Sequence, residues 1–266
     1  FAALGEGLDP FALGKDARGN TFFTMKCARG MTLADVLRTI RQGHPAMVEQ
    51  FPLGRLLTIF QKICDAVAFA HSKGVIHRDL KPGNVMIGDY GEVLVVDWGL
   101  ARAAKSRAPV DRGLAPGEAI AGADAVFGTS RDFNFDTART GLKTVSGRVL
   151  GTPGFMAPEH IRGDSTAIDI RADVYSLGAI LYSILTLHAP ISGQDITDIL
   201  RRIFAGEIVP PSEYYTDESI GRSTETHTGA GSPHLPHCPG GRIPSMLSEI
   251  TMKALAVNPA DRYQTV

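Results

Sequence analysis

The chain of 266 residues carries 27 Lys and Arg residues against 28 Asp and Glu residues, a formal net charge of -1. Hydrophobic residues make up 44% of the sequence and charged residues 21%, which is typical of a globular protein with a substantial core. The balanced charge argues against a nucleic-acid partner, because such proteins usually carry a basic excess.

The cysteines and the apolar runs narrow the class of protein further. Cys27, Cys64 and Cys238 are odd in number and widely spaced, so neither a disulfide framework nor a Cys-x-x-Cys metal site is predicted, and a reducing cytoplasmic location fits best. The longest apolar run, 174–187, is shorter than the roughly 20 residues of a membrane span, and we interpret it as a buried helix. Because the sequence starts without Met, we expect an N-terminal truncation of a longer protein, whose membrane anchor, if it has one, lies outside these residues.

Regular patterns begin early in the chain. Residues 21–25 are strand-like, and Thr32 precedes a helical pattern with Asp35 three residues later, the spacing of a capping box. A second helix is predicted over residues 53–73, and His71 near its end is interpreted as a local packing or capping residue. The expected buried faces are Leu33, Val36, Leu37 and Ile40 in the first helix and Leu53, Leu56, Leu57, Phe60, Ile63, Cys64 and Val67 in the second.

Residues 75–99 hold the candidate chemistry. Their apolar runs are too short for helices, and a glycine-containing turn between the last two predicts a β-hairpin. Asp79, Lys81 and Asn84 lie in the loop before this hairpin, and Asp97 follows it. A carboxylate that accepts a hydroxyl proton, a cation for phosphate oxygens, and an amide with a second carboxylate for Mg²⁺ together make a phosphoryl-transfer site.

These residues also carry a family resemblance. The segment HRDLKPGN at residues 77–84 resembles the catalytic loop of eukaryotic-type (Hanks-type) serine/threonine protein kinases, and DWG at residues 97–99 resembles their Asp-Phe-Gly metal motif with Trp in place of Phe. The resemblance implies that Asp79 is the catalytic base, that Lys81 steadies the transferring phosphoryl group, and that Asn84 and Asp97 bind Mg²⁺. His77, Arg78, Trp98 and Gly99 take structural or regulatory places in the same motifs.

The resemblance implies an α+β protein-kinase-like fold, present mostly as the helical C-terminal lobe with a small β-hairpin. Residues 1–30 would be a remnant of the N-terminal lobe and hinge, and residues 31–266 the C-terminal lobe, with flexible insertions near 103–147 and 212–241. ATP and Mg²⁺ are the implied cofactors, and proteins with Ser or Thr acceptors the implied partners. The nucleotide would contact Met25, Lys26, Cys27, Ala28 and Met86, together with Lys81 and Asp97.

The segment GTPGFMAPE at residues 151–159 resembles the end of a kinase activation segment, with Thr152 and Glu159 in it. Arg78 before Asp79 resembles kinases whose activation loop is ordered by phosphorylation, because a phosphate can pair with the guanidinium. Thr144 and Ser146 are therefore candidate autophosphorylation sites, and solvated loop hydroxyls remain the equal alternative.

The C-terminal third offers two further implied contacts. Asp173 would hold the backbone of the catalytic loop, with a simple N-cap role left open. Arg262, in LAVNPADRY at residues 255–263, would pair with Glu159.

Ser192 or Asp195 is expected to cap a helix that ends at Gly206. The last helix starts at Pro244, with Met246, Leu247, Ile250, Ala254 and Val257 inward, and His227, His234, His237 and Cys238 match no common zinc pattern.

Neither a Gly-x-Gly-x-x-Gly loop nor a Val-Ala-x-Lys strand is present, so we expect the chain as given to transfer phosphate weakly. The favoured function is a signalling serine/threonine protein kinase that phosphorylates itself. A pseudokinase-like scaffold and an aminoglycoside- or choline-type phosphotransferase are the alternatives. The second of these shares a His-x-Asp-x-x-x-x-Asn loop but would not be expected to carry Lys81 or the 151–159 segment.

Overall fold

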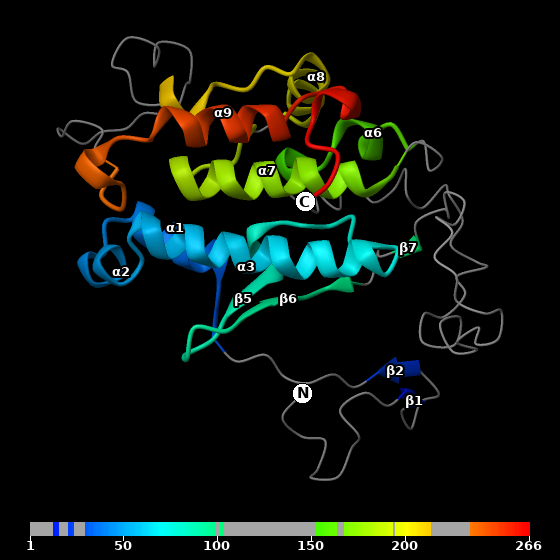
Figure 1. The fold of residues 1–266 in the computed structure, drawn as a ribbon, viewed down its shortest axis with the longest axis horizontal. Helices are drawn as coiled ribbons and strands as arrows, with labels where there is room; N and C mark the ends of the chain where they lie inside the picture. The colour runs from blue at the N-terminus through cyan, green and yellow to red at the C-terminus, as the bar shows by residue number, and fades with distance from the viewer. Residues whose placement is uncertain are drawn as a thin grey trace, which may run out of the picture.

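The structure, a computed structural model, describes residues 13–15, 21–23, 30–98, 102–103, 153–163, 168–193, 195–213 and 235–266. Its helices are stacked in layers above a small antiparallel sheet (Figure 1). Helices α7 and α9 lie above α3 and α1, and the β5–β6 hairpin lies below α3. The predicted α+β class, rich in helix with a small sheet, is confirmed.

The elements follow the chain in a simple order. The described helices are α1 (Leu33–Arg41), α2 (Pro45–Gln50), α3 (Leu53–Ser72), α6 (Pro158–Ile161), α7 (Ile170–Thr186), α8 (Ile196–Ala205) and α9 (Ser245–Ala254), with 3₁₀ turns at η1 (Pro82–Asn84), η3 (Pro153–Phe155), η4 (Pro211–Glu213), η6 (Pro239–Gly241) and η7 (Pro259–Asp261). The described strands are β1 (Leu13–Lys15), β2 (Thr21–Phe23), β3 (Met31–Thr32), β4 (Val75–Ile76), β5 (Val85–Ile87), β6 (Val93–Val95) and β7 (Arg102–Ala103).

The start of α1 agrees with the capping prediction. The Oγ1 of Thr32 accepts a hydrogen bond from the backbone N–H of Asp35 at 3.0 Å, which satisfies one of the unpaired donors of the first turn. The four residues predicted to share the inward face of this helix are all buried: Leu33, Val36, Leu37 and Ile40.

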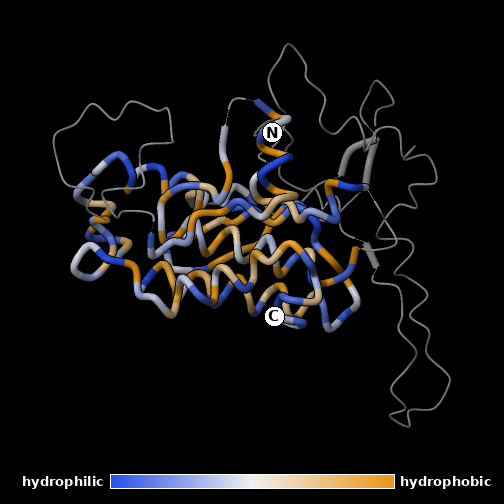
Figure 2. The backbone as a smooth tube through the Cα atoms, turned by 90° about the horizontal axis from the view of Figure 1, so that it is seen from above, coloured by the Kyte–Doolittle hydropathy of each residue, from blue (hydrophilic) through white to orange (hydrophobic). Residues whose placement is uncertain are grey.

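Helix α3 forms the centre of the main hydrophobic core. Its buried residues repeat at helical spacing and pack against α7, which supplies residues such as Ile180 and Ile184. Figure 2 shows hydrophobic residues along the interior segments of the tube. Ile59 belongs to this face although the sequence pattern did not single it out, whereas Leu57, Phe60 and Cys64 are only partly buried.

The central sheet has the strand order β3-β5-β6, and its two faces differ. Val85 and Ile87 on β5 are buried against the helices. Because side chains alternate along a strand, Met86 and its cross-strand partner Leu94 lie on the opposite face, where Leu94 is 47% exposed. The hairpin therefore presents one apolar face that the helices of the core do not cover.

Two predicted details of the later helices need correction, and one open alternative is resolved. Asp173 does not cap α7, because the helix begins at Ile170 and the side chain of Asp169 accepts the capping hydrogen bond from the N–H of Arg171. In α9, Met246 is 70% exposed rather than inward, and Ile250 is 36% exposed. The buried face of α9 consists of Ser248, Thr251 and Ala254, because this helix packs closely against α7. For α8, the capping residue is Asp195 and not Ser192.

Three of residues 235–241, which fall inside the insertion expected near 212–241, are buried in the core. Leu235 and Cys238 belong to the main cluster, and the Nε2 of His237 lies 2.8 Å from the carbonyl oxygen of Ile184. The carbonyl of His237 in turn accepts a hydrogen bond from the N–H of Leu53 at 2.8 Å. This segment thus joins the start of α3 to the end of α7. Within the described ranges, no helix has the length and apolarity needed to cross a membrane.

Candidate active site

Three of the predicted site residues meet at the carboxylate of Asp79. The Nζ of Lys81 lies 2.6 Å from Oδ2 of Asp79, and the side-chain amide of Asn84 donates to the same oxygen at 3.0 Å. The amide also donates to the backbone carbonyl of Asp79 at 2.8 Å. Within the described part of the chain Oδ1 of Asp79 accepts no hydrogen bond, and the side chain keeps 21% of its exposure. Such a carboxylate has one oxygen held and one available for a proton.

The turn η1 and the hairpin bring Asp97 to the same edge. The N–H of Asn84 donates to the carbonyl of Lys81 at 2.9 Å, which closes the turn, and the N–H of Val96 donates to the carbonyl of Asn84 at 2.9 Å. Asp97, the next residue, therefore lies beside the start of β5. It is exposed and has a left-handed backbone with φ of 66°, so the extended path of β6 ends there.

His77 is buried beneath this loop and fixes its path. Its Nδ1 accepts a hydrogen bond from the N–H of Asp79 at 3.3 Å, and its Nε2 lies 3.2 Å from the carbonyl oxygen of Val96. These two partners require the neutral tautomer that carries hydrogen on Nε2. Burial lowers the pKa of His77 and outweighs the opposing effects of Asp173, the Val96 carbonyl, Asp79 and Asp97. The ring of Trp98 packs on it with centroids 4.4 Å apart.

Asp173 on α7 holds the same loop from the other side. Its Oδ2 accepts the N–H of His77 at 2.9 Å and its Oδ1 accepts the N–H of Arg78 at 2.9 Å. Arg78 has φ of 71°, a conformation that is costly for a residue with a side chain, and the two bonds to the fully buried carboxylate offset that cost.

His71 is a residue of this site that the sequence analysis misinterpreted. Its Nε2 lies 2.8 Å from Oδ2 of Asp173, so it links the end of α3 to α7 instead of packing only locally. The position of His71 in the sequence could have indicated a buried partner. His71 continues the fully buried stripe of Ile63 and Val67 at intervals of four residues. A polar residue on a buried stripe needs a partner, and here the partner is 102 residues away in sequence.

A buried ion pair ties the segment after η3 to the end of the chain. Arg262 donates from its two terminal nitrogens to the two carboxylate oxygens of Glu159 at 2.7 and 2.8 Å. Its remaining donors reach backbone carbonyls at Ala256, Arg171 and Val257. Every guanidinium nitrogen therefore has a partner, which is the condition for a buried pair to be tolerated.

His160, next to Glu159 on α6, is a second histidine that the sequence analysis did not select. Burial lowers its pKa, and the nearby charge of Arg78 lowers it further. Arg78 therefore lies close to α6, which begins in the segment that resembles the end of an activation segment. The remaining predicted residues lie outside the described part of the chain: Met25, Lys26, Cys27, Ala28, Gly99, Thr144, Ser146 and Thr152.

The donor set fits a hard divalent cation. Because the amide nitrogen of Asn84 is committed to Asp79, its oxygen is the group left for a ligand, and the exposed carboxylate of Asp97 makes no hydrogen bond to the described residues. One amide oxygen and one carboxylate suit Mg²⁺ or Mn²⁺ and not a soft metal.

The sequence model of the protein kinase domain family matches residues 15–119 and 123–265. The chain belongs to this family. Among curated relatives, it is 31% identical over 248 residues to "Serine/threonine-protein kinase PknD" of Chlamydia abortus and 33% identical over 248 residues to the protein of the same name from Chlamydia felis, in both cases covering 92% of the chain and 22% of the relative. A similar protein from Protochlamydia amoebophila is 32% identical over 251 residues, with 92% and 21% covered.

The match confirms the Hanks-type resemblance and the protein-kinase-like fold. Protein kinase domains in general use ATP and a divalent metal, which is what membership of the family implies for this domain. The kinase domain spans about a fifth of the length of the curated relatives it matches.

Proposed function

We propose that this protein transfers the γ-phosphate of ATP to Ser and Thr hydroxyls of proteins. The observation that carries the proposal is the carboxylate of Asp79, with Oδ2 held by Lys81 and Asn84 and Oδ1 left for an acceptor hydroxyl. The relatives named as serine/threonine-protein kinases support the choice of acceptor.

Each residue of the loop has a chemical task in this proposal. Asp79 accepts the proton of the substrate hydroxyl as that oxygen attacks phosphorus. Lys81 is 30% exposed at its side chain, so its ammonium group can turn from Asp79 toward the phosphoryl oxygens during transfer. While Lys81 contacts the phosphoryl oxygens, Asn84 keeps the carboxylate of Asp79 oriented. The amide of Asn84 donates hydrogen bonds to both the side chain and the backbone carbonyl of Asp79.

Magnesium is the metal that we propose for this site, with the oxygen of Asn84 and the carboxylate of Asp97 as its protein ligands. A bound divalent cation neutralises negative charge on the nucleotide phosphates. The backbone hydrogen bond from Val96 to Asn84 supports this choice, since it brings the residue before Asp97 next to Asn84.

The outward face of the hairpin is the proposed floor for adenine. Met86 is half-buried on that face, away from the helical core, and it has the apolar side chain such a surface needs. Met25, Lys26, Cys27 and Ala28 would supply the hinge, residues 1–30 the edge of the N-terminal lobe and residues 31–266 the C-terminal lobe.

We also propose a cytoplasmic signalling role, which the widely spaced cysteines support, and self-phosphorylation at Thr144 or Ser146.

The test compares the whole protein with its Asp79→Asn variant in labelled phosphate transfer from ATP to itself and to a generic Ser/Thr protein substrate. Loss of the base should lower the rate by about 10²- to 10⁴-fold, whereas Asp65→Asn, a change at an exposed carboxylate on α3, should leave it unchanged. Equal rates for the protein and the Asp79→Asn variant would refute the assigned base. Transfer to aminoglycosides or choline in place of protein would refute the substrate class.

A further inference from the structure

The last residues of strand β6 leave one carbonyl group that the sheet does not use. The N–H of Val96 donates to the carbonyl of Asn84 beside β5, so in an antiparallel ladder the neighbouring residue, Val95, points its own N–H and carbonyl away from β5. Among the described strands, β6 is the edge of this sheet, whose order is β3-β5-β6. A partner for the carbonyl of Val95 therefore has to come from outside the ladder.

The side chain of Trp98 provides that partner. Its indole Nε1 donates to the carbonyl oxygen of Val95 at 2.9 Å, so a side chain three residues later closes the turn that follows β6. The same ring packs on the buried His77, with the ring planes inclined by 50°. A phenylalanine, which the family motif has at this place, offers a ring but no N–H group. The hydrogen bond to Val95 thus depends on the tryptophan.

Asp97 lies inside the turn that this hydrogen bond closes. Its φ of 66° is in the left-handed region, which is uncommon for residues other than glycine. Both of its neighbours are fixed, because the carbonyl oxygen of Val96 lies 3.2 Å from Nε2 of His77 and Trp98 is bonded to Val95. A backbone conformation of this kind persists only where the surrounding contacts determine it. One of those contacts here is the indole N–H group.

We propose that Trp98 is a positioning residue for Asp97, and that its indole N–H group keeps the Asp97 carboxylate where it binds the divalent metal. Without the hydrogen bond, the turn can relax toward the commoner conformations with negative φ, which turn the carboxylate in another direction. The inference rests on the proposed metal site, since Trp98 acts only through Asp97. It gives Trp98 no contact of its own with the metal, the nucleotide or the protein substrate.

The test measures how strongly a divalent metal assists nucleotide binding to the whole protein. Calorimetric Kd values for ADP with Mn²⁺ and with EDTA give the factor by which the metal strengthens binding. Trp98→Phe removes the N–H group and keeps an aromatic ring beside His77. It should reduce the factor by about 2- to 10-fold, the effect of one neutral hydrogen bond, and leave the Kd in EDTA unchanged. A merely structural role would weaken ADP binding equally in the two conditions.

A second variant separates the N–H group from the size of the ring. Benzothienylalanine at position 98 replaces the indole N–H group by sulfur and keeps the two fused rings. It should reduce the Mn²⁺ factor as much as Trp98→Phe does. A normal factor with this residue would show that ring volume decides the effect, and it would overturn the role given to the hydrogen bond.

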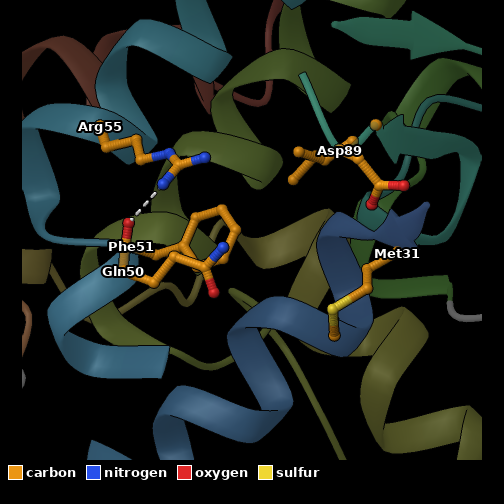
Figure 3. Close-up of a pocket in the computed structure, with 7 residues that line it drawn as sticks. Met31, Gln50, Phe51, Arg55 and Asp89 are labelled. Atoms are coloured by element: carbon orange, nitrogen blue, oxygen red, sulfur yellow. Dashed lines mark hydrogen bonds between the residues drawn. The ribbon is translucent and has the colours of Figure 1, made fainter. Parts of the chain in front are cut away.

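The two aspartates at the ends of the hairpin supply matched controls. Asp97→Asn removes the charge of the proposed ligand and should abolish most of the strengthening by Mn²⁺. Asp89 is an exposed carboxylate in the turn at the other end, and Figure 3 shows it across a pocket from Arg55. Asp89→Asn should leave the factor unchanged, because the whole length of the hairpin separates this turn from Trp98.

A kinetic arm shows whether the effect reaches phosphate transfer. In Trp98→Phe the KM for Mg²⁺ should rise about 2- to 10-fold, the KM for a Ser/Thr peptide should stay the same, and excess Mg²⁺ should restore kcat. Equal Mn²⁺ factors in Trp98→Phe and the unsubstituted protein would overturn the positioning role alone. An unchanged factor in Asp97→Asn would overturn the metal site and this inference with it. Normal Mn²⁺ factors without any peptide phosphorylation would instead count against the proposed function.

Discussion

The carboxylate of Asp173 accepts a hydrogen bond from the backbone N–H of Arg78 at 2.9 Å, although the two residues are 95 positions apart. Arg78 takes a left-handed backbone conformation at that point, and Asp79 follows immediately. The direction in which the proposed base points is thus set by a helix in another layer of the fold, through one fully buried carboxylate.

Asp173→Ala should therefore damage both stability and activity. The change leaves the N–H groups of His77 and Arg78 without acceptors, which costs about 2–6 kcal/mol in the free energy of unfolding. The matched control is Asp169→Ala on the same helix, which removes an N-cap and should cost about 1 kcal/mol with kcat unchanged. Urea unfolding and phosphate transfer measure the two effects. Equal losses of kcat in the two variants would contradict the positioning role.

The pair of Glu159 and Arg262 should show strong coupling. Arg262→Ala leaves a buried carboxylate without its partner and should cost about 3–5 kcal/mol of stability. The double change Glu159→Gln with Arg262→Ala should cost less than the sum of the two single changes. A double-mutant cycle in urea measures this, with the exposed Arg201 and Glu207 pair as the reference that should show little coupling. Additive costs at the buried pair would argue against a coupled interaction.

Local sequence accounts for much of the site. Asp79, Lys81 and Asn84 lie within six residues, so a single turn brings them together, and the motif spacing was enough to select them. The capping of α1 by Thr32 was predictable for the same reason. The contacts of Asp173 and Arg262 came from the family resemblance, since no pattern in the sequence pairs residues about 100 positions apart.

The remaining differences have physical causes. His71 was misinterpreted because its partner lies on another helix. Asp173 was a candidate cap because the apolar run begins beside it, yet the helix starts one turn earlier, at Ile170. Met246 was placed inward by periodicity alone, while the close approach of α9 to α7 selects a face of small residues. In each case tertiary packing decided the outcome.

Acid should destabilise the fold through its buried histidines. Burial lowers the pKa of His77, His160 and His237 below the ordinary value of 6.5, so the unfolded chain binds more protons than the folded chain as the pH falls through that value. Stability is then fully present above about pH 6.5 and falls below it, by at most about 1.4 kcal/mol per pH unit for each histidine.

His237→Gln isolates one of these contributions, because its side-chain amide can still donate to the carbonyl of Ile184. We expect a shallower loss of unfolding free energy between pH 7 and pH 5 in this variant. His44→Gln, at an exposed histidine, should leave the slope unchanged. Parallel pH profiles for His237→Gln and the unsubstituted protein would exclude a contribution from His237.

The contact between α7 and α9 depends on the missing side chain at Gly178. A Cβ atom there would lie 2.7 Å from the Cβ of Ala254 and 3.2 Å from the Cγ of Leu255, so the helices would have to separate. Gly178→Ala gains up to about 1 kcal/mol of helix propensity but incurs an overpacking cost of about 1–3 kcal/mol. We therefore expect Gly178→Val, with its larger side chain and poorer helix propensity, to be clearly destabilising in urea unfolding.

Ala254→Gly should restore part of the stability lost in Gly178→Ala, since it removes the Cβ atom that the new side chain contacts. Gly54→Ala, in open space on α3, should instead stabilise the protein slightly; equal effects at Gly54 and Gly178 would show that helix propensity and not packing decides both.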